Sequence, residues 1–339
     1  MSKGRARPPL WGLKAAPEAL TLAMIVAVHG LWLALLIAAG LGLPWWLTVP
    51  ALVLLTVQFQ SLQHEALHGH PTRSALLNEV LVSLPLGLFY PFRRYRTLHL
   101  RHHNDENLTD PFDDPESWYF AAEDFDQQHS LVQALWRFNA TLVGRLVVGP
   151  FLAVAGLIRR DGEAILRGDR GIARDWALHG LGLAGVLILL LLTGFSPLLY
   201  VFGVALPAMS ILLIRSFAEH RASALKEHRT AIIPDRGPLA LLFLNNNLHA
   251  VHHAHPSVAW YRLPRLFAER RADFEASNGG YGYRSYVEVF AKHWRRPLDT
   301  VPHPLWNRAN RTAPLGPTSS ASSAAEQEEK PAADDQDRT

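Results

Sequence analysis

His249-Ala-Val-His252-His253 is the stretch around which this chain is organised. The same H-x-x-H-H spacing occurs earlier as His99-Leu-Arg-His102-His103, and a third cluster, His64-Glu-Ala-Leu-His68, precedes both. Residues three and four apart share one face of a helix, so each cluster would present its imidazoles together. Neutral imidazole is the commonest metal ligand in proteins. Eight such rings exceed what one tetrahedral zinc site can use, so the pattern predicts two metal ions bound almost wholly by nitrogen.

Two long blocks of the sequence carry no charged residue. No Asp, Glu, Lys or Arg occurs between Glu18 and Glu65, or between Asp175 and Arg215. A membrane-spanning helix needs roughly 20 apolar residues, so each block fits two spans, and Pro44 and Pro197 are natural turn points. We predict four transmembrane helices in two hairpins, at about 19–43, 45–62, 176–193 and 197–218. Blocks of this length without charge disfavour the alternative of buried helices in a soluble protein.

The distribution of basic residues predicts which side of the membrane holds the metal site. They lie in the leader 1–18, in the middle segment between the hairpins and after Arg215, which places both termini and the middle segment in the cytoplasm. All three histidine clusters then lie on the cytoplasmic side of the inner (cytoplasmic) membrane. We expect 74–92 and 131–158 to be re-entrant or interfacial segments, and the last helix to continue past Arg215 as far as Lys226.

The predicted fold is therefore an all-α integral membrane protein with four spans, interfacial helices and a cytoplasmic helical cap that carries the metal site. Its domains are a basic cytoplasmic leader 1–18, a membrane domain 19–310 and a tail 311–339. The tail is rich in Ser, Ala, Pro, Gln and acidic residues and is expected to be disordered. The formal net charge is only +3 and no nucleic-acid-binding motif is present, so we expect no nucleic-acid partner. The absence of cysteine excludes disulfides and thiolate metal sites.

Several residues around the clusters allow two interpretations. Asp110 and Asp114 could hold imidazole N–H groups in place or belong to a solvated loop. His64-Glu-Ala-Leu-His68 also fits H-E-x-x-H, the motif of zinc proteases, although a protease would leave the two H-x-x-H-H clusters unexplained. A histidine-rich metal transporter is a further alternative, but its ligands should lie near the middle of the bilayer rather than at helix ends.

The order and spacing of the three clusters resemble the membrane fatty-acid desaturase superfamily. Asp114-Pro115-Glu116 and the run Asn245-Asn246-Asn247 before His249 are similar as well, and the resemblance covers roughly 58–294. It implies two iron ions, cycling between Fe²⁺ and Fe³⁺, and dioxygen as co-substrate. The implied ligands are His64, His68, His99, His102, His103, His249, His252 and His253, with His220, just after the fourth span, as a ninth. Asn246 would orient a water at the site.

The resemblance also implies an activity, that of an oxidoreductase. We expect oxygen-dependent desaturation of a fatty acyl chain in an acyl lipid or acyl thioester, with a lipid or carotenoid hydroxylase or ketolase of the same architecture as the alternative. The chain contains no His-Pro-Gly-Gly stretch, glycine-rich nucleotide motif or cysteine cluster, so electrons would come from a separate ferredoxin or cytochrome b5. The arginine-rich segment 159–174 is either an ordinary positive-inside loop or a docking surface for that donor or for anionic lipid.

Overall fold

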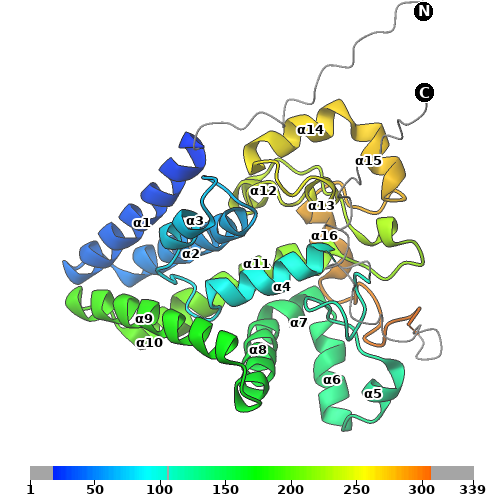
Figure 1. The fold of residues 1–339 in the computed structure, drawn as a ribbon, viewed down its shortest axis with the longest axis horizontal. Helices are drawn as coiled ribbons and strands as arrows, with labels where there is room; N and C mark the ends of the chain where they lie inside the picture. Colours follow the sequence, from blue (N-terminus) through cyan, green and yellow to red (C-terminus); the bar gives the residue numbers. More distant parts are fainter. Residues whose placement is uncertain (1–17, 105–106, 307–339) are drawn as a thin grey trace, which may run out of the picture. The chain divides into compact units, whose positions relative to one another are not determined.

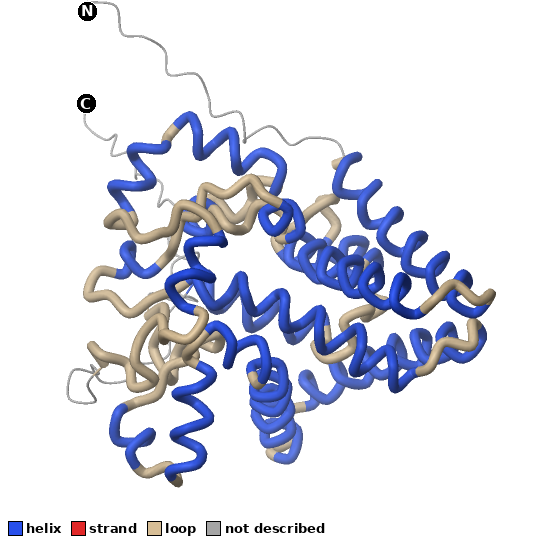
Figure 2. The backbone as a smooth tube through the Cα atoms, turned by 180° about the vertical axis from the view of Figure 1, so that it is seen from behind, coloured by secondary structure: helices blue, strands red, loops and turns tan. Residues whose placement is uncertain are grey.

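The computed structural model describes residues 18–104 and 107–306. Within these residues every regular element is a helix, and the only strand-like features are isolated β-bridges (Figure 2). The expected disordered tail 311–339 and all but the last residue of the basic leader lie outside the described residues.

Four helices in the described part of the chain are long and apolar enough to cross a membrane. They are α1 (Ala19–Gly40), α2 (Trp45–Leu67), α9 (Arg170–Leu192) and the continuous stretch Pro197–Glu219. The last of these comprises α10 (Pro197–Leu199), the π-helical turn η2 (Tyr200–Ala205) and α11 (Leu206–Glu219). The prediction of an all-α membrane protein with four spans is confirmed. The helix α9 begins earlier than expected because the Asp169 side chain caps it, accepting a hydrogen bond from the Ile172 N–H at 3.0 Å.

Each hairpin turns at a glycine in the left-handed region of backbone conformation. Gly42 (φ +101°) lies between α1 and α2, and Gly194 (φ +70°) follows α9. The two turns also lie close together, because a Cβ atom added at Gly40 would stand 2.1 Å from the carbonyl oxygen of Thr193. Figure 1 shows both turns at the same end of the helices, away from α13 and α16.

The two hairpins pack through α2, which contacts η2 and α11. Burial of apolar side chains such as Leu36, Leu52 and Val204 supplies the core between them. A buried polar chain reinforces it: the Trp32 indole donates to the Tyr200 hydroxyl at 2.8 Å, and that hydroxyl donates to the Leu86 carbonyl at 2.9 Å. These contacts fix α1, η2 and the segment that leads into the second histidine cluster.

Between the hairpins, the described residues form several helices, none of them both long and apolar enough to be a further candidate span. In 74–92 the one helix that precedes α4 (Phe92–Asn104) is α3 (Ala75–Leu81). Residues 131–158 are divided among α6 (Ser130–Asn139), α7 (Leu142–Val147) and α8 (Gly149–Leu166) rather than forming one interfacial helix. The short α5 (Ala122–Asp126) precedes them, and α4 carries the second cluster. The guanidinium of Arg94 on α4 forms two 2.8 Å hydrogen bonds to Asp161 on α8, and Asp161 also accepts from Trp176 on α9 at 2.9 Å. These contacts fasten α4 against both helices.

The segment after the fourth span folds over the ends of α2, α4 and α11. Its helices are η3 (Lys226–Arg229), α12 (Pro238–Leu242), α13 (His249–Ala254), η4 (Trp260–Arg262), α14 (Leu263–Glu269), α15 (Arg271–Ser277) and α16 (Tyr286–His293). The prediction that the last span continues to Lys226 is wrong, since α11 ends at Glu219. His220 is extended (φ −131°, ψ 145°) and pairs with Thr230 in an antiparallel bridge. The backbone therefore leaves the helix at the ring expected as a ninth ligand.

Candidate metal centre

The structure gathers nine histidines into two groups, and within each group one nitrogen of every ring lies within 4.8 Å of the others. The first group comprises His64, His68, His99, His103 and His252, and the second comprises His102, His220, His249 and His253. These are the eight residues of the three sequence clusters together with the candidate ninth. They come from the end of α2, from α4, from the residue after α11 and from α13.

The ring nitrogens that face one another are arranged as metal ligands are. Five Nε2–Nε2 pairs lie 3.0–3.2 Å apart: His99–His103, His102–His220, His220–His249, His249–His253 and His103–His252. Two nitrogens bound at about 2.1 Å to one ion, at right angles, would be about 3.0 Å apart. In addition, the Nε2 atoms of His64 and His68 are buried without a hydrogen-bond partner among the described residues. A buried nitrogen without a partner is costly unless a cation satisfies it.

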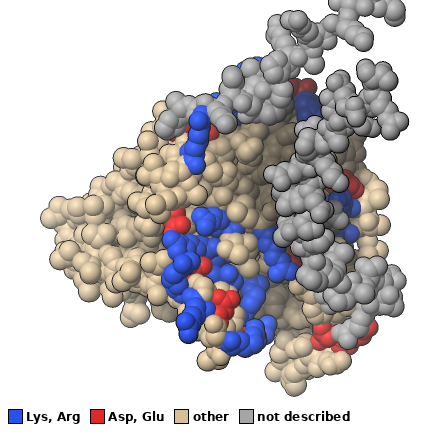
Figure 3. All heavy atoms as spheres, in the orientation of Figure 1, with Lys and Arg blue, Asp and Glu red and all other residues tan. Residues whose placement is uncertain are grey.

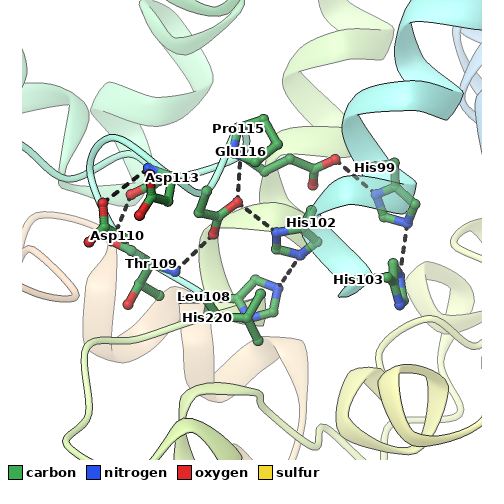
Figure 4. Close-up of polar contacts among 12 residues, drawn as sticks. His99, His102, His103, Leu108, Thr109, Asp110, Asp113, Pro115, Glu116 and His220 are labelled. Atoms are coloured by element: carbon green, nitrogen blue, oxygen red, sulfur yellow. Dashed lines mark hydrogen bonds and ion pairs between the residues drawn. The ribbon is translucent and has the colours of Figure 1, made fainter. Parts of the chain in front are cut away.

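Carboxylates on the outer side of the rings fix which nitrogen is free to bind a metal. The Nδ1–H of His102 donates to Asp114 at 2.8 Å, and the Nδ1–H of His99 donates to Glu116 at 2.8 Å (Figure 4). In the neutral form of each ring the proton is then on Nδ1, which leaves the Nε2 lone pair directed at its group. A metal ion between the facing Nε2 atoms of His102 and His220, which lie 3.0 Å apart, would take up a lone pair from each neutral ring.

In the third cluster, polar side chains also contact the Nδ1 atom of a ring. The Nδ1 of His249 lies 3.3 Å from both Glu219 Oε1 and Asn246 Oδ1. The amide of Asn246 in turn donates to Glu219 Oε1 at 2.9 Å, and Arg215 approaches the same carboxylate to 3.0 Å. Asn246 thus contacts a candidate ligand ring directly.

Burial favours the neutral imidazole, which is the form that binds metals. It lowers the pKa of His68 to about 2 and that of His220 to about 3, with neighbouring imidazoles adding to the effect. His102 differs, because the carboxylates of Glu116 and Asp114 outweigh its burial and raise its pKa to about 9. The same carboxylates make this imidazole a stronger donor to a metal ion.

Asp110 and Asp114, the two loop carboxylates singled out from the sequence, have different surroundings. Asp114 is buried, and besides His102 it accepts the backbone N–H groups of Thr109 and Glu116 at 2.8 and 2.9 Å. Asp110 accepts the backbone N–H groups of Phe112 and Asp113 at 2.8 and 3.0 Å, so it shapes the turn before Asp114 (Figure 4). Asp114 therefore orients an imidazole ring, whereas these hydrogen bonds of Asp110 shape the loop.

Two carboxylates of the site, Glu116 and Glu219, were not among the residues expected there. Glu116 could have been found from its place in Asp114-Pro115-Glu116, two residues after a carboxylate already expected near the rings. Glu219 had a weaker signal: it lies four residues after Arg215, the spacing of a helical ion pair, and next to His220.

Three other histidines have partners away from the two groups. The Nδ1 of His70 contacts Glu18 at 2.8 Å, His29 contacts the Ile25 carbonyl at 2.8 Å, and His179 contacts the Leu88 carbonyl at 2.7 Å. Their hydrogen bonds account for them as structural residues.

Comparison with known proteins identifies the family of the chain. Residues 43–285 match the family model described as fatty acid desaturase, a region that includes both H-x-x-H-H clusters, His64, His68 and His220. A search of curated proteins found no match. The matched region covers most of the chain and agrees with the four candidate spans and the two histidine groups. The chain therefore belongs to the fatty acid desaturase family.

Proposed function

We propose that this protein is an oxygen-dependent desaturase that introduces a double bond into a fatty acyl chain at a histidine-bound pair of iron ions. The two groups of facing Nε2 atoms are the observation that supports it most. Nitrogen ligands suit iron as well as zinc, but zinc has no redox chemistry, so a family of oxidoreductases points to iron. The pair would supply reduction of dioxygen to two waters, using two hydrogens from adjacent methylenes and two electrons and two protons delivered from outside.

The residues of this chain would orient and shield that chemistry. Asp114, Glu116 and Glu219 would keep the Nδ1 protons of His102, His99 and His249 on the outer side of the rings, so that the Nε2 atoms of these three are available. The burial of His102 and His252, each only 1% exposed, keeps bulk water from the centre. A dry site protects a reactive intermediate from side reactions.

A cavity of about 420 Å³ beside the second histidine group supports the proposal that the substrate is an acyl chain. Its lining includes Asp114, Glu116 and His220, and its walls contain apolar side chains such as Leu157 and Leu213. Small-molecule sites commonly have volumes of about 300–1,000 Å³ with mostly apolar walls and a few polar groups. An acyl chain in this cavity would lie beside His220, one of the rings of the second group.

A separate donor, ferredoxin or a cytochrome of the b5 type, would deliver the electrons. Arginines gather on one face over the region of α4, α8 and the start of α9, while the hairpin end of that face carries no charge (Figure 3). Among them, the side chains of Arg159, Arg167 and Arg174 are 69–74% exposed. This surface would suit an acidic donor. The positive-inside rule supports a cytoplasmic location for it and for the metal centre.

The alternatives from other classes fit the geometry less well. In a zinc protease of the H-E-x-x-H type Glu65 would act on a water, yet Glu65 is buried and accepts the backbone N–H of Trp260 at 3.1 Å. A transporter would hold its ligands between spans, whereas α4 and α13 lie outside the four candidate spans. A hydroxylase or ketolase shares the same centre and is separated from a desaturase only by its product.

Expression in a bacterial host that lacks its own desaturase tests the proposal. Chromatography and mass spectrometry of the total lipids should reveal new carbon–carbon double bonds that depend on the protein and on oxygen. Added oxygen on a fatty acid or carotenoid, without new double bonds, would instead assign the hydroxylase or ketolase activity. Purified protein without iron would contradict both.

A further inference from the structure

The cavity beside the histidine groups contains a buried cation that the proposed chemistry does not use. Arg145, on α7, is 6% exposed and forms part of the cavity lining. Its Nε donates to the carbonyl of Asn139 at 3.2 Å, and its guanidinium carbon lies 3.8 Å from the ring centre of Trp118 and 5.6 Å from that of Phe217. Among the described residues no carboxylate pairs with it. A buried charge without a counter-ion is expensive, which makes it a candidate binding group.

The other arginines of the cavity lining are already engaged. Arg215 pairs with Glu219 at 3.0 Å, Arg159 pairs with Glu163 at 3.0 Å, and Arg160 donates to the Pro115 carbonyl at 3.4 Å. Arg145 therefore differs from them in being buried without a carboxylate partner in the part of the chain that the structure describes. Burial lowers its pKa to about 9, which still leaves it positively charged at neutral pH.

The carboxylates that share the cavity lining are engaged as well. Asp299 accepts the Tyr119 hydroxyl at 3.0 Å and the backbone N–H of Thr300 at 2.9 Å, and Asp114 and Glu116 hold histidine rings. The amide oxygen of Asn139 is a second buried polar group that has no hydrogen-bond partner among the described residues. Asn139 is 1% exposed and also belongs to the lining. Both groups lie beside Gly149, where an added Cβ would approach Arg145 Cδ to 2.9 Å and Asn139 Oδ1 to 3.4 Å.

We propose that Arg145 binds the anionic head of the acyl substrate, so that the protein acts on a chain that ends in a free carboxylate or a phosphate rather than on a neutral ester. Arginine offers a planar fork that matches both anions, and a dry cavity strengthens the contact. Phe217, which lies under the guanidinium, precedes His220 by less than one helical turn. A head group bound here would determine which carbon atoms of the chain, numbered from that head group, lie next to the metal centre. This substrate class rests on the proposed function.

A binding assay without turnover tests the proposal separately from the activity. Purified protein in nanodiscs, without reductant, is loaded with tritiated hexadecanoate at pH 8 and competed with unlabelled hexadecanoate, its methyl ester or hexadecyl phosphate. We expect the ester to compete at least about tenfold more weakly than the acid, as a charge-assisted contact predicts. If hexadecyl phosphate competes more strongly than the acid, the anion site is supported and its natural head group is a phosphate.

Substitutions at the same position complete the test. In Arg145→Gln the preference for the acid should fall from about tenfold to less than threefold, while Arg145→Lys should retain part of it. Arg137→Gln is the matched control, because Arg137 lies on the neighbouring α6, is exposed and contacts Gln133 and Phe125 outside the cavity lining. Its preference should equal that of the unaltered protein.

Either of two results would overturn the proposal. One is equal competition by acid and ester in the unaltered protein, which requires no variant and holds even if Arg145→Gln does not fold. The other is a folded Arg145→Gln protein that keeps the tenfold preference. Because the assay includes neither reductant nor product analysis, a preference that depends on Arg145 stands even if the product proves to be hydroxylated. Likewise, desaturation by a protein without that preference would leave the proposed function intact.

Discussion

The replacement Asp114→Asn should weaken one of the two metal sites selectively. One oxygen of Asp114 accepts from His102 Nδ1 at 2.8 Å and from the Glu116 N–H at 2.9 Å, and the other accepts from the Thr109 N–H at 2.8 Å. All three partners are donors, and asparagine offers only one acceptor oxygen. Its NH₂ group must therefore face either the imidazole and Glu116 or the Thr109 N–H, so at least one donor meets another donor whichever way the amide is turned.

The size of the effect follows from the bonds that are lost. A hydrogen bond to a charged group contributes about 1.5–3 kcal/mol, and a buried donor left unsatisfied costs about 1–3 kcal/mol. Loss of the carboxylate also frees the imidazole of His102 to carry its proton on Nε2, which blocks it as a ligand. Replacement of such a partner typically lowers metal affinity or activity about 10- to 100-fold. Metal affinity should fall in the second group, which contains His102, and stay unchanged in the first.

Iron retention measures this directly. Purified protein is loaded anaerobically with Fe(II), dialysed against a chelator of graded strength and assayed for iron per chain. Unaltered protein should retain two ions up to a certain chelator concentration. Asp114→Asn should lose one of them at a chelator concentration about 10- to 100-fold lower. Asp273→Asn, an exposed carboxylate on α15, is the control and should release neither. Simultaneous loss of both ions, or unchanged retention, would refute the division into two groups or the role of Asp114.

Three further predictions concern the site and its support. His252→Ala should abolish activity and lower the iron content while the protein still inserts into membranes, and turnover by this variant would show that His252 is not an essential ligand. His220→Ala should release the ion of the second group, which would keep three histidines, whereas His129→Ala, at an exposed helix cap, should retain both ions. Asp161→Asn should lower the free energy of unfolding by about 3–5 kcal/mol, because Arg94 stays buried without its partner. A thermal unfolding midpoint equal to that of the unaltered protein would contradict this pairing.

Much of the fold could be predicted because the membrane imposes simple rules on a sequence. Uncharged blocks of fixed length predict spans, and the four candidate spans lie where those blocks are. The ends of helices were harder to predict. The stretch after Arg215 has no proline or glycine to mark a helix end, yet the backbone becomes extended at His220 because it pairs with Thr230. That pairing joins residues ten positions apart across an irregular loop, which neither helix propensity nor a turn residue marks in the sequence.

The site shows a similar division between what is local and what is not. The spacing within each cluster is a local property, and it indicated which rings could bind metal. The contacts of Glu116 and Glu219 depend on how a loop and a helix end meet the rings, which spacing does not record. The sequence could not show that Arg145 lacks a carboxylate partner among 18–104 and 107–306, because this depends on where each acidic residue of those ranges lies in the fold.

The need for a ninth histidine follows from helix geometry. Successive residues of an α-helix are turned by about 100°, so i and i+4 lie about 40° apart, while i+3 lies about 60° to the other side of i. On α4 the i,i+4 pair His99 and His103 joins the first group and His102 the second; on α13 the pair His249 and His253 joins the second and His252 the first. The two H-x-x-H-H motifs thus give three rings to each group. The remaining i,i+4 pair, His64 and His68, can serve only one of them, which leaves the other with three unless a single ring is added from elsewhere. His220, released from its helix by the extended backbone, is that ring.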